Sequence, residues 1–376
     1  MSIQLFIPKF HVDECLDGIK ECLEKGWTGL GFKTLEIEKD WCNYTHFNHA
    51  HFINSATSGL HLALEVYKRE NNWQHDDEVI TTSLTFISTN HAILYAGLTP
   101  VFADINNTLC LDPSSVLSCI TEKTKALIFV GIGGNMGQYE DIRKICSQKG
   151  IIFILDAAHM AGSKHMDKQI GTDADVSVFS FQAVKNLPTA DAGMICFKSK
   201  EHDEYVRKLT WLGINKDTYA RTVSQGSYKW MYDVEELGYK YHGNSIMAAI
   251  AIVQLKYLDQ ENSYRRSIST HYRERLQDLD WLEFINITNI NETSNHLFQI
   301  RCQDRDALMT YLNNNDVFPG VHYRDNKLYK MYSSFKGDCP NSLKASSEII
   351  SLPVHQNLSL NDVEAVCILL NNYKQK

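Results

Sequence analysis

The sequence lacks the features that mark several specialised classes of protein. None of its ten cysteines forms a CxxC pair, so we expect reduced, buried thiols and neither a disulfide framework nor a zinc ribbon. The 20 glycines and 7 prolines among 376 residues are too few for a fibrous repeat or a disordered low-complexity chain. The longest apolar run, at about residues 246–255, is well short of the ~20 residues that cross a membrane. The first ten residues show no signal-peptide pattern, so we expect a cytoplasmic protein without a membrane partner.

Positive charge is not in excess either. The chain has 37 lysines and arginines against 45 aspartates and glutamates, which gives a net charge of −8. This balance argues against a protein that binds nucleic acid or an anionic membrane surface. Hydrophobic residues, by contrast, make up 44% of the chain and include 18 tyrosines, 16 phenylalanines and 6 tryptophans. The chain is therefore long and apolar enough to bury a sizeable core in two structural units.

The pattern of apolar residues changes near residue 245. Before it, short apolar segments without polar alternation are separated by segments with helical periodicity, which is typical of parallel strands covered on both faces. We expect strands at 51–53, 78–80, 100–104, 126–130, 151–155 and 176–179, and helices at 13–25, 34–42, 59–70, 88–95, 113–120 and 139–149. After it, we expect a long helical stretch at 245–278, strands at 282–285 and 296–300, and helices at 306–313 and 361–373. The sequence predicts a large α/β domain over 1–245 with a mainly parallel sheet, a smaller α+β domain over 246–376, and a ligand cleft between them.

An acidic residue at the end of a buried strand is the first candidate for chemistry. Residues 151–155 are all apolar and lead directly into Asp156. In open α/β sheets, ligands bind at the carboxyl ends of the strands. A carboxylate buried there needs a positive or protonated partner. The alternative interpretation is that Asp156 caps the segment that follows it.

A single lysine lies between two apolar segments, 29 residues after Asp156. Residues 176–179 and 189–197 both have the pattern of strands, and Lys185 lies in the polar turn between them. Most lysines are simply exposed at the surface. In a half-buried pocket, however, the pKa of a lysine falls, and its amine can then form a Schiff base.

Two further segments suit a phosphorylated aromatic ligand. Residues 54–64 begin with small and hydroxyl side chains, including Thr57 and Ser58, and then continue as an amphipathic helix. Free N–H groups and hydroxyls at a helix N-terminus bind anions such as phosphate, although the same residues are also ordinary N-caps. Phe86 lies in a polar loop after a strand, where its ring could stack on a planar ligand, although a core phenylalanine is commoner.

Together these four segments contain the parts of a pyridoxal 5′-phosphate (PLP) site. The sequence resembles the DegT/StrS-type (DegT/DnrJ/StrS) sugar aminotransferases, which have the aspartate-aminotransferase fold, type I among PLP-dependent enzymes. The matching motifs extend over nearly the whole chain, at residues 27–31, 54–64, 85–89, 156–159, 180–187, 238–242, 320–323 and 352–355. The resemblance implies a homodimer that moves an amino group from L-glutamate to a nucleotide-linked keto-sugar, with the cofactor passing through its pyridoxamine (PMP) form. The product would be an amino sugar of a surface polysaccharide or related glycan.

The resemblance also implies a role for each matching residue. Lys185 would hold the cofactor covalently and shuttle a proton, Asp156 would pair with the pyridinium nitrogen, and His159 would lie near the phenolic oxygen. The remaining cofactor contacts would come from Ala56, Thr57, Ser58, Phe86 and Ser180, and from Lys240 of the neighbouring subunit. The substrates would contact Thr28, Gly29, His322 and Tyr323.

The chain departs from the pattern of this family at several positions. Ala56 replaces a usual glycine, Gln182 a histidine or tyrosine, Lys240 an asparagine, and the pair at 242–243 an Arg-Met pair. Lys240 could contact phosphate as a point charge. The missing arginine bears on how the carboxylate of the amino donor is recognised. Residues 324–326 also differ from the usual apolar stretch, which bears on the identity of the acceptor.

Three other interpretations stay open at this point. The same fold and cofactor could act on a small non-nucleotide ketone, such as a phosphorylated ketone or an aminocyclitol precursor. In the related dehydratases a histidine replaces the lysine, so Lys185 argues against dehydration. A non-catalytic α/β binding protein would use the same segments only as caps and core. The spacing of His46, His49 and His51 favours a polar loop before a strand over a metal site, because metal ligation also needs a fixed geometry.

Overall fold

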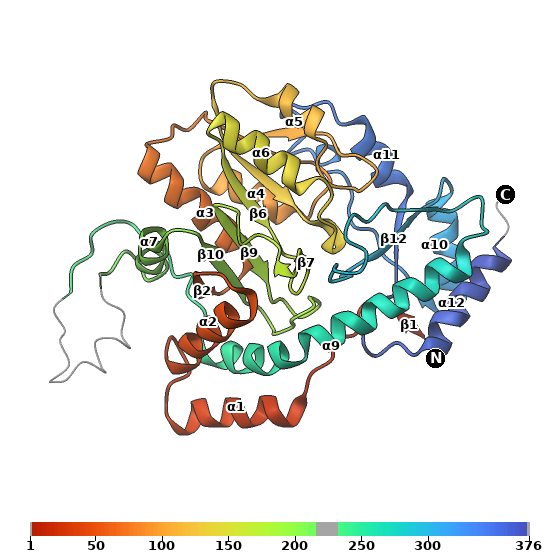
Figure 1. Ribbon diagram of the computed structural model, residues 1–376, viewed down its shortest axis with the longest axis horizontal. Helices are drawn as coiled ribbons and strands as arrows, with labels where there is room; N and C mark the ends of the chain where they lie inside the picture. The colour runs from red at the N-terminus through yellow and green to blue at the C-terminus, as the bar shows by residue number, and fades with distance from the viewer. Residues whose placement is uncertain (1, 216–231, 374–376) are drawn as a thin grey trace.

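A seven-stranded sheet forms the centre of the computed structural model, which describes residues 2–215 and 232–373 (Figure 1). Strand β10 is antiparallel to both of its neighbours, and the other neighbouring strands are parallel. The predicted α/β class with a mainly parallel, mixed sheet is therefore confirmed. In spatial order the strands are β2 (His49–Ile53), β10 (Gly193–Phe197), β9 (Val176–Ser180), β6 (Ile152–Asp156), β5 (Thr124–Val130), β3 (Glu78–Thr82) and β4 (Thr99–Ala103).

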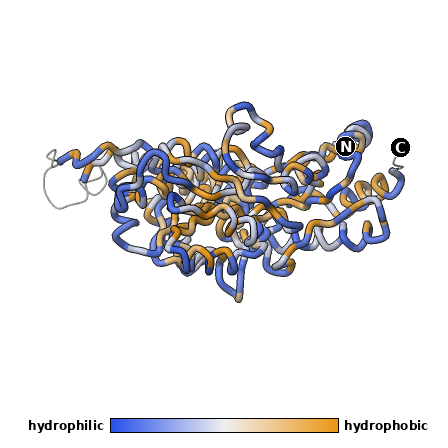
Figure 2. Tube along the Cα trace, turned by 90° about the horizontal axis from the view of Figure 1, so that it is seen from above, coloured by the Kyte–Doolittle hydropathy of each residue, from blue (hydrophilic) through white to orange (hydrophobic). Residues whose placement is uncertain are grey.

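Helices cover both faces of this sheet, which explains why its strands are apolar without alternation. Successive side chains of β6 point to opposite faces, so Phe153 and Leu155 pack in one core and Ile154 packs in the other. Figure 2 shows hydrophobic residues concentrated along these inner layers. The first core contains side chains of α2 (Phe32–Thr45), α5 (Pro113–Cys119), α6 (Tyr139–Lys149) and α9 (Ser245–Leu276), and the second those of α3 (Ala56–Asn71), α4 (Ile87–Tyr95) and α7 (Lys200–Thr210).

The C-terminal part is built on a three-stranded sheet in the order β11-β12-β14. The predicted long helix is present and unbroken as α9, and Asn244 caps its start by accepting a hydrogen bond from the backbone N–H of Met247 at 2.9 Å. The sequence pattern does not predict α7, α11 or β14. The elements here are β11 (Glu283–Phe284), β12 (Phe298–Arg301), α10 (Arg305–Asn314), β13 (Val317–Phe318), a 3₁₀ turn η2 (Asn326–Leu328), α11 (Pro340–Glu348), β14 (Ile349–Leu352) and α12 (Leu360–Asn372).

The N-terminal residues pack against the C-terminal part rather than the large sheet. β1 (Ile3–Gln4) pairs with β13, and the carbonyl oxygen of Gln4 accepts a hydrogen bond from His355 Nε2 at 3.1 Å. β1 and α12 lie on the same side of the molecule (Figure 1). From there α1 (Val12–Glu24) runs back along α9. These contacts join residues before position 245 to residues after it. The division into two domains at residue 245 stays a prediction.

Two small features complete the fold and bear on the earlier expectations. A 3₁₀ turn η1 (Ile132–Gly134) follows β5, and a short hairpin joins β7 (Lys164–His165) to β8 (Lys168–Gln169). None of the ten cysteines, all of which the structure describes, is in a disulfide, and eight of them are buried. In the ranges that the structure describes, no helix combines the length and the apolar character needed to cross a membrane.

Candidate active site

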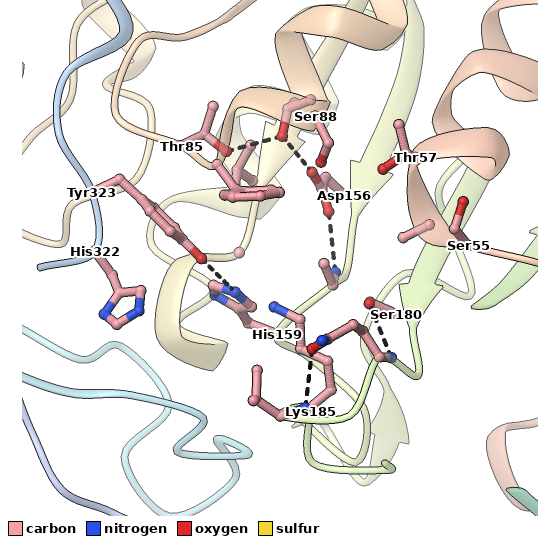
Figure 3. A pocket seen from close by; sticks show the side chains of 18 of the residues that line it. Ser55, Thr57, Thr85, Ser88, Asp156, His159, Ser180, Lys185, His322 and Tyr323 are labelled. Carbon is pink, nitrogen blue, oxygen red and sulfur yellow. Dashed lines mark hydrogen bonds between the residues drawn. The ribbon is translucent and has the colours of Figure 1, made fainter. Parts of the chain in front are cut away.

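Most of the predicted site residues meet in one cavity at the carboxyl ends of β6 and β9 (Figure 3). The cavity has a volume of about 370 Å³. It lies at the edge of the sheet where open α/β folds bind ligands. The predicted residues that line it are Ala56, Thr57, Phe86, Asp156, His159, Ser180, Lys185, His322 and Tyr323.

Asp156 is the last residue of β6, and its carboxyl group is held by neutral donors. Oδ2 accepts a hydrogen bond from the Thr89 hydroxyl at 2.7 Å, and Oδ1 accepts one from the backbone N–H of Ala158 at 3.1 Å. The second bond closes a local turn, and no helix follows Asp156, so the interpretation of this residue as a helix cap is not borne out. Burial raises the pKa of Asp156, against the effects of these donors and of Lys185. The side chain is therefore fixed in orientation and suits a protonated nitrogen as its partner.

Lys185 lies in the turn between β9 and β10, and its side chain extends into the cavity (Figure 3). The next residue anchors this turn: the Asn186 amide nitrogen donates to Asn262 Oδ1 at 2.6 Å and to the Ser294 carbonyl oxygen at 2.8 Å. Burial lowers the pKa of Lys185 to about 8, although the Asp156 carboxylate acts in the opposite direction. About a tenth of the amine is then unprotonated at pH 7, far more than for an ordinary lysine, and a nucleophile or a base requires this form.

The N-terminus of α3 forms the end of the cavity that is suited to an anion. Ser55 caps the helix by accepting a hydrogen bond from the backbone N–H of Ser58 at 3.2 Å, while Ala56 and Thr57 line the cavity. β10 passes so close to this turn that only glycine fits at position 193. An added Cβ at Gly193 would lie 2.9 Å from the backbone nitrogen of Ala56. The helix N-terminus and the Thr57 and Ser180 side chains can together bind a phosphate.

Phe86 precedes α4 and leaves much of its ring uncovered. The side chain is 58% exposed although it is large and apolar, and its ring centroid is 5.9 Å from that of Tyr323. These values exclude the interpretation that Phe86 is a core residue. An aromatic ring exposed at a cavity wall is instead available to cover the face of a planar ligand.

His159, His322 and Tyr323 form the wall opposite the helix N-terminus (Figure 3). The backbone N–H of Gly133 donates to His159 Nδ1 at 3.1 Å, and His159 Nε2 lies 3.1 Å from the Tyr323 hydroxyl oxygen. His322 Nδ1 lies 2.9 Å from the Ser351 hydroxyl oxygen. Burial, and then the charge of Lys185, lower the pKa of His322 to about 4 and that of His159 well below its usual range. Both imidazoles are therefore neutral at physiological pH.

Four predicted site residues do not line this cavity. The carbonyl oxygens of Thr28 and Gly29 accept hydrogen bonds from the backbone N–H of Ser245, at the start of α9. The Ser58 hydroxyl donates to Asn54 Oδ1, just before the start of α3, at 2.6 Å. Lys240 Nζ lies 3.3 Å from the centroid of the Trp211 ring. The roles of these four residues stay predictions, and that of Lys240 depends on a neighbouring subunit.

Some residues of the site were missed from the sequence. Thr89 orients Asp156, and the Asn186 amide secures the lysine turn. His296 Nδ1 in turn lies 2.8 Å from Asn186 Oδ1. The sequence could have indicated two of them, because Thr89 follows Phe86 at helical spacing and Asn186 is adjacent to Lys185. His296 gave no comparable signal, since it is more than 100 residues away in the chain.

The side chains of the cavity fit PLP. One end offers a helix N-terminus and hydroxyls for a phosphate, the strand end offers a carboxyl group for a ring nitrogen, and the amine of Lys185 lies in the same space. The uncovered ring of Phe86 can take one face of a pyridine ring. Each part of the cofactor therefore has a chemically matched group on this chain.

Comparison with known proteins agrees with this geometry. SpsC of Bacillus subtilis, a spore coat polysaccharide biosynthesis protein, is 32% identical over 94% of this chain and 92% of its own length. Among solved structures, the aminotransferase PseC of Helicobacter pylori, involved in the biosynthesis of pseudoaminic acid, superposes with a TM-score of 0.90 at 26% identity, covering 99% of this chain and 98% of its own. The PLP form of the putative sugar aminotransferase Spr1654 of Streptococcus pneumoniae gives 0.88 at 26% identity, covering 98% and 97%. The model of the DegT/DnrJ/EryC1/StrS aminotransferase family matches residues 11–371. The chain belongs to this family and is a PLP-dependent aminotransferase.

Proposed function

We propose that this aminotransferase transfers the amino group of L-glutamate to the keto group of a nucleotide-linked sugar, for an amino sugar of a surface polysaccharide or related glycan. The observation that carries the amino-transfer chemistry is the pair of Asp156 and Lys185 in one cavity, where no ion pair among the described residues neutralises either group. The sugar acceptor is supported by the relatives, which include a spore coat polysaccharide protein and a putative sugar aminotransferase.

Each group in the cavity has a distinct part in this reaction. PLP, when bound, supplies an electron-withdrawing ring that stabilises negative charge at the carbon that carries the amino group. Asp156 holds a proton on a ring nitrogen, and its bonds to Thr89 and Ala158 keep it in place. Lys185 would take a proton from that carbon and deliver it to the cofactor carbon bound to the same nitrogen, a task for which a pKa of about 8 is suitable. Phe86 covers one face of the ring and excludes water from it.

A homodimer in which Lys240 reaches the phosphate of the neighbouring subunit is part of the proposal. Lys240 lies beside Trp211 and lines no part of its own cavity. We expect Lys240→Ala to weaken PLP binding in a dimer by about tenfold. The variant loses one exposed charge contact with the phosphate, which is worth roughly 1.4 kcal/mol. Light scattering gives the oligomeric state, and equilibrium dialysis gives the affinity. A monomeric holoenzyme with unchanged affinity in the variant would contradict this part.

The donor and the acceptor are tested in separate half-reactions. PLP-loaded enzyme absorbs visible light, and that band should disappear when L-glutamate is added. Loss of the band with another amino acid but not with L-glutamate would contradict the donor. PMP-loaded enzyme is then offered nucleotide-linked keto-sugars, free keto-sugars and small phosphorylated ketones, and the band should return only with the first group. Return of the band only with a small ketone would replace the proposed acceptor with the alternative one.

A further inference from the structure

The hydrogen bonds of His159 determine which of its nitrogens carries the proton. The backbone N–H of Gly133 points at Nδ1, 3.1 Å away. A backbone N–H can only donate, so Nδ1 accepts and carries no hydrogen. Burial lowers the pKa of His159 well below its usual range, which makes the ring neutral. Its single proton is therefore on Nε2.

The proton on His159 Nε2 determines whether the Tyr323 hydroxyl donates or accepts in the contact between the two side chains. His159 Nε2 lies 3.1 Å from the Tyr323 hydroxyl oxygen. Because Nε2 donates, the hydroxyl oxygen accepts, and the proton of Tyr323 is not used in this contact. Burial raises the pKa of Tyr323, so the phenol stays protonated. Among residues 2–215 and 232–373, the Tyr323 hydroxyl has no hydrogen-bond partner other than His159. Its O–H is therefore free to donate into the cavity that Tyr323 lines (Figure 3).

The same contacts hold this arrangement rigid. Gly133 has a φ of +64°, a left-handed backbone that favours glycine, and its N–H donates to His159. The carbonyl oxygen of His159 accepts a hydrogen bond from the Ser294 hydroxyl at 2.6 Å. The ring centroid of His296 lies 4.3 Å from that of His159. The donor is thus oriented before any ligand arrives, which is the condition under which such a group is most effective.

The position of Tyr323 selects its partner. Tyr323 enters the cavity from the side opposite Ser55, Thr57 and Ser180 (Figure 3). The phosphate end therefore lies away from it, whereas His159 lies close to it and Lys185 lines the same cavity. Two acceptors can reach this side: the phenolic oxygen of the cofactor, which the resemblance places near His159, and a group of the substrate that reacts near the lysine.

We propose that Tyr323 donates a hydrogen bond to the carbonyl oxygen of the keto substrate, with His159 and Gly133 as positioning residues that keep its O–H free. The inference rests on the proposed function, in which a ketone is aminated. Amination replaces the C=O bond with a bond to nitrogen, and the oxygen leaves as water after it has gained two protons. A donor at this oxygen polarises the C=O bond and stabilises the negative charge that develops as nitrogen attacks.

Tyr323→Phe removes only the hydroxyl and tests the proposal directly. PMP-loaded full-length enzyme is mixed with 2-oxoglutarate, or with the keto acid of whichever amino acid removes the visible band, and return of the band is followed. We expect the limiting rate to fall about 100-fold, while the half-saturating concentration changes less than about threefold, since the ground state loses only a neutral hydrogen bond. Tyr44→Phe is the matched control, because the Tyr44 hydroxyl bonds Asp259 outside the cavity.

The outcomes separate this inference from the proposed function. A wild-type enzyme that reacts with none of the keto acids contradicts amino transfer itself. A wild-type enzyme that reacts, together with a Tyr323→Phe variant of equal limiting rate, overturns the role of Tyr323 and leaves amino transfer intact.

The protonation of His159 is tested on the holoenzyme by nuclear magnetic resonance with ¹⁵N-labelled histidine. We expect a protonated Nε2 and an unprotonated Nδ1, with the signal assigned by its absence in His159→Gln. Glutamine also offers an N–H near the position of Nε2, so His159→Gln should keep the rate within about tenfold, whereas His159→Leu should fall as far as Tyr323→Phe. A proton on Nδ1 would overturn the proposal, and so would equal rates in the Gln and Leu variants.

Discussion

Two buried groups of charged residues lie next to the central sheet and differ in how their charges are compensated. Beside β2, the Glu38 carboxylate accepts hydrogen bonds from His51 Nδ1 and from the backbone N–H of Phe52, both at 2.8 Å. Its second oxygen pairs with Arg207 at 2.8 Å, and Arg207 also pairs with Asp203 at 2.7 Å. In the cavity, Asp156 and Lys185 take part in no ion pair with any residue that the structure describes.

The pKa values of the two groups shift in opposite directions. Burial alone would raise the pKa of Glu38, but Arg207 and His51 hold it below its ordinary value. For Asp156 burial dominates and the pKa is raised, and for Lys185 burial lowers it to about 8. Charges beside β2 therefore compensate one another and stabilise the folded chain, whereas those in the cavity are left for a ligand.

Removing the lysine should have the largest effect. We expect Lys185→Ala to abolish covalent attachment of PLP and to slow the half-reaction with L-glutamate by on the order of 10⁴-fold or more, because both the nucleophile and the proton carrier are lost. Mass spectrometry after borohydride reduction measures the attachment. Lys200→Ala, at an exposed pair with Glu204, should keep both properties. A Lys185→Ala enzyme with the wild-type rate would show that the lysine is wrongly assigned.

Glu38→Ala should destabilise the fold more than any change in the cavity. It leaves the half-buried guanidinium of Arg207 without one of its two acidic partners, and the buried N–H groups of His51 and Phe52 without their acceptor. We expect the free energy of unfolding to fall by about 3–5 kcal/mol, the usual cost of breaking a buried ion pair. Urea unfolding of the PLP-free protein measures this free energy. A loss below about 1 kcal/mol would mean that the charges beside β2 stabilise the fold no more than those in the cavity.

Asp156→Asn should show the reverse pattern. Asparagine keeps the shape of the side chain and removes a carboxyl group that no cation neutralises, so the free energy of unfolding without PLP should stay within about 1 kcal/mol of wild type. The half-reaction should slow by about 10²–10³-fold, because the ring nitrogen loses its charged partner. Destabilisation as large as that of Glu38→Ala would mean that Asp156 is mainly structural.

A further effect should appear in the pH dependence of stability. The pKa of Lys185 is about 8 in the folded protein, against 10.5 for a free lysine. Between these values the unfolded chain binds more protons, so the stability of the PLP-free wild type rises with pH across this window. Lys185→Met should therefore be more stable than wild type below pH 8, and this advantage should shrink as the pH approaches 10.5. Urea unfolding on both sides of the window measures it, with Lys200→Met as a control without such a trend.

Local patterns account for the parts of the fold that could be predicted. The segments 126–130 and 176–179 were recognised from their apolar residues and lie in β5 and β9. α9 was recognised from a helical pattern of about 30 residues. β14 has only four residues and is defined by its pairing with β12, about 50 residues earlier, so its own residues carried little signal. The N-terminal β1 was missed for the same reason, since its partner is β13.

The sequence by itself determined the order of the elements and placed Asp156 at the end of a strand and Lys185 in a turn, because side-chain periodicity and turn residues act over short distances along the chain. Only the tertiary structure decided which groups meet. Thr89 reaches Asp156 across 67 residues, and Tyr323 reaches His159 across 164. The pKa of a buried group depends on its depth and on such distant neighbours. That is why two groups of charged residues with similar composition serve stability in one place and chemistry in the other.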